Sequence, residues 1–85
     1  MKRIIEIPEY NPKRGIILNW TSDFEITVDT DGNQVHISGN SAGLESLANH
    51  LLNLAQDNVP EGTHIHLDDY NSLNDNSAEL IIERM

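Results

Sequence analysis

The sequence predicts an α+β fold in which one amphipathic helix covers one face of a mostly antiparallel sheet. Leucine and alanine recur at helical spacing in one stretch, residues 38–58. Short segments on both sides of that stretch alternate apolar and polar residues, as half-buried strands do. We therefore expect about six strands in the order β-β-β-β-α-β-β. A chain of 85 residues suits one domain, residues 1–85.

The helix is expected to begin near Asn40 or Ser41, either of which can cap its first turn, and to end before Pro60. Its apolar side is expected to lie against the sheet and consists of Leu44, Leu47, Ala48, Leu51, Leu52, Leu54 and Ala55. Its polar side is expected to face solvent and consists of Glu45, Asn49, His50, Asn53, Gln56 and Asp57.

Six segments carry the alternation expected of strands: residues 3–7, 15–20, 24–29, 34–38, 64–68 and 78–84. The first two are expected to pair as a hairpin. The third and fourth are joined at Asp31-Gly32, a dipeptide typical of tight hairpin turns. The pattern leaves the order of the strands in the sheet open.

The charge distribution limits the classes of partner. The net charge is −9, and no lysine or arginine lies between Gly15 and Glu83, where twelve acids lie. Such a surface repels nucleic acid and anionic lipid and favours a cationic protein partner, although acidity can also serve solubility alone. The chain has no cysteine and no apolar run long enough for a signal peptide or a membrane span, so we expect a cytoplasmic protein.

A histidine-rich strand offers the clearest candidate for metal chemistry. His64, His66 and Asp68 share one strand face, and His36 could join them from another strand. The run HIHLDD resembles the HxHxDH motif of metallo-β-lactamase-type hydrolases, with Asp69 in place of the last histidine. A solvated strand face explains these residues more simply, so we expect no metal and no cofactor, with a metal-dependent enzyme or metal sensor as the alternative.

Aromatic residues are few. Trp20 is expected to lie in the core, whereas Tyr70 lies in a polar loop beside Asp68 and Asp69 and suits a contact residue.

Three stretches, GLESLANHLLNLA, VPEGTHIHLDDYNSL and AELIIER, resemble the immunity-protein-type small domains found beside toxins of bacterial polymorphic toxin systems. The resemblance covers residues 38–84. It implies a protein that is not an enzyme and that blocks a cognate toxin by stoichiometric binding until the toxin is exported.

Many such toxins act on nucleic acid through basic clefts, which an acidic protein complements. The expected partner-binding residues are Asp68, Asp69, Tyr70, Glu79 and Glu83. A further alternative is an accessory interaction domain, or a dimer, that pairs through an exposed sheet edge.

Overall fold

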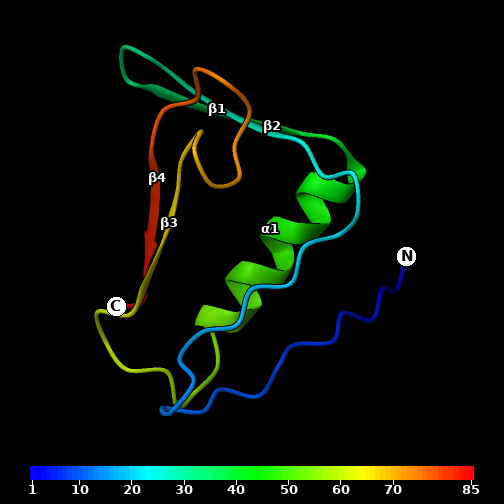
Figure 1. Cartoon of the computed structure of the whole chain (residues 1–85), viewed down its shortest axis with the longest axis vertical. Coiled ribbons are helices and arrows are strands. Elements are labelled where there is room, and N and C mark those ends of the chain that lie inside the picture. The colour runs from blue at the N-terminus through cyan, green and yellow to red at the C-terminus, as the bar shows by residue number, and fades with distance from the viewer.

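The computed structural model describes residues 1–85 and contains one helix and four strands in two separate antiparallel hairpins (Figure 1). The α+β class is confirmed. The expected six-stranded sheet is wrong, because each sheet has only two strands. The elements are β1 (Ile26–Asp31), β2 (Gln34–Gly39), α1 (Ser41–Leu54), β3 (His64–Leu67) and β4 (Leu80–Glu83).

The first hairpin, β1 and β2, turns at Gly32, whose φ of 57° is the left-handed conformation that glycine adopts most easily. Ile26 and Val28 of β1 are buried, as their alternation predicts. The outer edge of β1 is also covered, because its carbonyl groups at Ile26 and Val28 accept from the backbone N–H groups of Asn74 (2.8 Å) and Ala78 (2.7 Å).

The second hairpin, β3 and β4, closes the other side of the core with Ile65 and Leu67 of β3 buried. Arg84, just after β4, joins this hairpin to the helix. Its Nη1 donates to the carbonyl oxygens of Leu54 (2.8 Å) and Gln56 (3.0 Å), which lie at the C-terminal end of α1. A cation there satisfies carbonyl groups that have no partner within the helix.

Asn40 caps the N-terminus of α1, as one of the two predicted alternatives. Its Oδ1 accepts from the N–H of Gly43 (2.7 Å) and from the N–H of Glu25 (3.0 Å), and its Nδ2 donates to the carbonyl of Asp23 (2.9 Å). The cap therefore also fixes the chain that leads into β1. The helix has 14 residues, and it is neither long nor apolar enough to cross a membrane.

The segment before β1 does not form the predicted hairpin. Residues 3–7 and 15–20 are not strands, and the only ladder contact there is one bridge between Asn11 and Gly15. The segment instead runs along α1 (Figure 1). Its backbone forms hydrogen bonds with side chains of α1 and of Gln56, two residues beyond the helix: Thr21 N–H to Ser46 Oγ (2.9 Å), Asn49 Nδ2 to Glu6 O (3.2 Å), Asn53 Nδ2 to Ile17 O (3.0 Å), Gln56 Nε2 to Pro8 O (3.1 Å) and Tyr10 N–H to Gln56 Oε1 (2.9 Å).

This arrangement reverses part of the predicted burial of the helix. Asn49, His50 and Asn53 are buried, although the pattern places them in solvent. The leucines divide: Leu47 and Leu54 are buried, whereas Leu44, Leu51 and Leu52 remain 53%, 50% and 46% exposed. The reason is that the N-terminal segment covers the polar side, while two small hairpins cover less of the apolar side than one broad sheet would.

The core lies between α1 and the two hairpins and contains Ile26, Val28, Leu47, Leu67 and Leu73.

Trp20 packs at the edge of this core. Its ring stacks on Phe24 (4.4 Å between centroids) and meets the ring of His50 edge-on (4.3 Å). His50 is fully buried with no hydrogen bond to either ring nitrogen, and this burial lowers its pKa.

Candidate functional site

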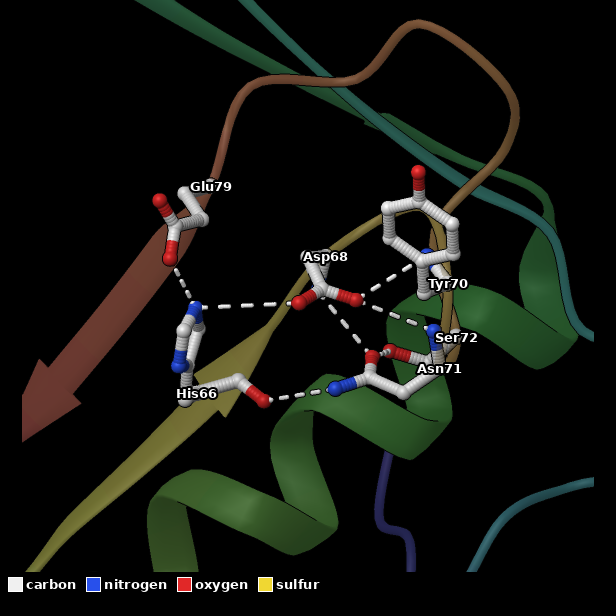
Figure 2. Close-up of polar contacts among 6 residues, drawn as sticks. All are labelled: His66, Asp68, Tyr70, Asn71, Ser72 and Glu79. Atoms are coloured by element: carbon white, nitrogen blue, oxygen red, sulfur yellow. Dashed lines mark hydrogen bonds and ion pairs between the residues drawn. The ribbon is translucent and has the colours of Figure 1, made fainter.

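A tight turn after β3 positions the acidic and aromatic residues that the sequence singles out (Figure 2). Asp68 Oδ1 accepts from the backbone N–H groups of Tyr70 and Asn71, both at 3.0 Å. Asn71 completes the turn, because its Oδ1 accepts from Asp68 N–H (3.0 Å) and its Nδ2 donates to the carbonyl of His66 (3.0 Å). The turn therefore holds the backbone of Tyr70 in place through short local bonds.

The other carboxylate oxygen of Asp68 is directed toward His66, together with Glu79 (Figure 2). Asp68 Oδ2 lies 3.8 Å from His66 Nε2, and Glu79 Oε1 contacts the same nitrogen. The pairing of β3 with β4 explains this: His66 lies opposite Ile81, so Glu79, two residues earlier, lies diagonally across on the same face. Residues distant in sequence thus meet around one imidazole.

Tyr70 stands at the outer side of this cluster and is 98% exposed. It borders a hollow of about 390 Å³ that is lined by Asp68, Asp69, Tyr70, Ser77 and Glu79. Of the three acids in this lining, Asp68 and Glu79 form ion pairs with His66, and Asp69 forms none. The hollow therefore presents an aromatic ring beside carboxylates that have little positive charge to balance them.

The structure brings four of the five predicted partner-binding residues together around this hollow. The fifth, Glu83, lies at the far end of β4, opposite His64. There it lines a different, largely apolar groove of about 490 Å³, together with Leu51, Leu54, Ala55, Ile82, Arg84 and Met85. The hydrophobic pattern does not indicate that groove, because it predicts that Leu51 and Leu54 lie against a sheet.

The alternative metal set is only partly assembled. The ligand atoms of His66, Asp68 and Glu79 lie within 4.8 Å of one another, so one imidazole and two carboxylates converge. His64 is not among them; its Nδ1 instead lies 3.2 Å from the carbonyl of Gly62. His36 lies on β2, opposite Asp29, in the other hairpin. The sequence pattern missed Glu79 as a neighbour of His66, because only the register of β3 and β4 reveals it.

The fold and this surface define a small α+β domain that presents an exposed tyrosine and a group of acids on one side. The family model for Immunity protein 32 matches residues 34–85, which is more than half of the chain. The chain therefore belongs to the Immunity protein 32 family, and the resemblance to immunity proteins is confirmed. No curated protein and no solved structure matches the chain.

Proposed function

We propose that the protein neutralises a cognate toxin by binding it stoichiometrically through the surface of Asp68, Asp69, Tyr70 and Glu79, which we call the acidic tyrosine surface. Membership of the Immunity protein 32 family supports the role of immunity protein. The observation that carries the choice of surface is Tyr70, whose side chain is almost fully exposed and whose backbone is held by the turn at Asp68, beside three acids. Aromatic residues of this kind are frequent anchors of protein interfaces.

The charge of the chain supports a partner with a basic surface. A net charge of −9 accelerates encounter with a cationic cleft, and nucleases have such clefts because they bind phosphates. Acidic side chains in the cleft of a nuclease would occupy the positions of those phosphates. We therefore propose that the protein acts in the cytoplasm of the producing bacterial cell, as an inhibitor rather than an enzyme, without direct contacts to nucleic acid or membrane.

The test is the affinity for the cognate toxin, captured from the native host with the tagged protein and then measured by calorimetry in low and in high salt. Tyr70→Ala is expected to weaken binding by about 30-fold or more, since buried tyrosine anchors contribute about 2 kcal/mol. Asp69→Asn is expected to weaken it less, and to reduce its salt dependence.

Glu61→Gln is the matched control for the loss of one acid, since Glu61 is exposed in the loop before β3. Unchanged affinity in Tyr70→Ala, or an equal loss in Glu61→Gln and Asp69→Asn, would show that the toxin binds elsewhere.

Metal binding is the second candidate function, and the convergence of His66, Asp68 and Glu79 favours it. Imidazole with carboxylates suits zinc and similar ions. Calorimetric titration with Zn²⁺ tests it: His66→Ala should abolish stoichiometric binding and His64→Ala should retain it. If His66→Ala and His64→Ala bind Zn²⁺ equally, this site is excluded.

A further inference from the structure

The outer edge of β2 is the open edge of the first hairpin. The opposite edge, on β1, is covered by residues 74–78 through the backbone bonds described above and by Ser77, whose Oγ accepts from Val28 N–H (3.2 Å). Residues 34–38 of β2 are exposed. In a two-stranded antiparallel pair, every second residue of each strand turns its N–H and C=O groups away from the partner strand. β2 therefore presents a row of backbone groups that another strand can pair with.

This edge has none of the features that usually prevent strand pairing. The β2 sequence, QVHISG, contains no lysine, arginine, acid or proline, and its register with β1 is uninterrupted over six residue pairs. Natural sheets block free edges with charged residues, prolines or bulges. A regular edge without these features is free to pair with another strand.

One face of the same edge is apolar. Val35 and Ile37 are 64% and 44% exposed, and they share this face with Gly39, since alternate residues of a strand point the same way. Leu44 of α1, itself 53% exposed, lies beneath Gly39: a Cβ atom there would be 3.3 Å from Leu44 Cγ. The apolar strip thus continues from β2 onto the helix.

We propose that β2 pairs antiparallel with β2 of a second copy of the chain, across a two-fold axis at His36. This pairing would join the two hairpins into one four-stranded sheet, in the order β1-β2-β2-β1. It places Val35 of each copy opposite Ile37 of the other on the apolar face, a favourable cross-strand pair.

The charge of the edge favours a second copy over a cationic partner. In a two-fold pairing about His36, a charge at positions 35 to 37 lies opposite or diagonal to its own copy, so an acid there would lie near a like charge. β2 has no acid; Asp29 and Asp31 lie one strand away on β1, and Glu25 lies just before β1, beside Gly39. A strand that had to receive a basic toxin would instead gain from acids on the edge itself.

The test is sedimentation of the full chain at pH 8, from about 1 to about 300 µM. A contact of one strand edge lies at the small end of specific interfaces, below about 1,200 Å², so we expect a dimer with a dissociation constant in the micromolar range. Raising the salt concentration should strengthen it, because two copies of charge −9 repel each other less when screened. The proposed toxin complex has the opposite salt dependence, which separates the two proposals.

Val35→Lys and Ile37→Lys should each weaken the dimer by tenfold or more, because each places like charges on the shared edge. Ile81→Lys is the matched control: Ile81 is 58% exposed on β4, outside the proposed interface. Circular dichroism of each variant establishes that it folds. A monomer at every concentration, a dimer unaffected by either edge variant, or a dimer lost equally in Ile81→Lys overturns the proposal.

Discussion

The replacement of Asn53 by alanine tests the most unexpected feature of the fold, the burial of the polar side of α1. Asn53 is 1% exposed, and its Nδ2 donates to the carbonyl of Ile17 (3.0 Å) and to Oδ1 of Asn49 (3.0 Å). Alanine removes both bonds, and Asn49 Oδ1 keeps only the longer bond from the N–H of Asn19 (3.4 Å). At about 1–2 kcal/mol for each bond that the buried amide loses, the change should cost about 2–4 kcal/mol.

That cost is a large part of the total free energy of unfolding. A domain of this size has a free energy of unfolding of about 4–13 kcal/mol, at about 0.05–0.15 kcal/mol per residue. Urea unfolding, followed by the fluorescence of the single tryptophan, measures the loss. With an m-value of about 1–1.5 kcal/mol per molar urea, the midpoint should fall by about 2–3 M.

Leu51→Gln is the matched control on the other side of the helix. The hydrophobic pattern makes Leu51 a core residue, yet it is 50% exposed, so glutamine, which has a similar helix propensity, should cost about 1 kcal/mol or less. If Leu51→Gln destabilised the protein more than Asn53→Ala, the described orientation of α1 would be refuted.

Three further changes test other contacts. Burial lowers the pKa of His50, so the unfolded chain binds the proton more readily than the folded one. The free energy of unfolding should therefore fall as the pH drops through 6.5, the ordinary pKa of histidine. His50→Leu should remove this pH dependence in urea titrations at several pH values. If the parent chain and His50→Leu lost stability in parallel as the pH falls, His50 would not be the source of the pH dependence. Gly43→Ala places a Cβ 2.1 Å from the carbonyl oxygen of Glu25 and should cost about 3 kcal/mol, seen as a lower Tm; an unchanged Tm contradicts this close approach. Arg84→Ala removes the donor to the last carbonyls of α1 and should cost about 1–2 kcal/mol, with faster amide exchange in the last helical turn; exchange like that of the parent chain would show that this cap is not formed.

Local signals in the sequence predict the local structure well. The Asn40 cap and the turn at Gly32 depend on neighbouring residues only, and the structure contains both. Ile26 and Val28 are buried, as their alternation indicates. The turn of Asp68 and Tyr70 is equally local, so three of the four residues of the acidic tyrosine surface come from one short run of residues.

The errors concern contacts between distant segments. The alternation in residues 15–20 is that of a strand, but its hydrogen-bond partners are amide side chains on α1 rather than another strand. Hydrophobic periodicity counts Asn53 as polar and places it in solvent, although an amide with backbone partners is readily buried. Glu79 and Glu83 are predicted to share one surface, but they lie apart. Only the register of β4 with β3 shows that Glu79 lies beside His66 and that Glu83 lies at the far end of β4.

The way in which α1 holds the N-terminal segment has a consequence for how this protein can diverge. Asn49, Asn53 and Gln56 bind main-chain atoms of residues 6, 8, 10 and 17, and they make no demand on the side chains at those positions. The outward side chains of this segment can therefore change during evolution without loss of these bonds, whereas Asn49, Asn53 and Gln56 cannot. The family match begins only at Gln34, beyond this segment. Related proteins could thus alter one whole side of their surface while they keep the same helix.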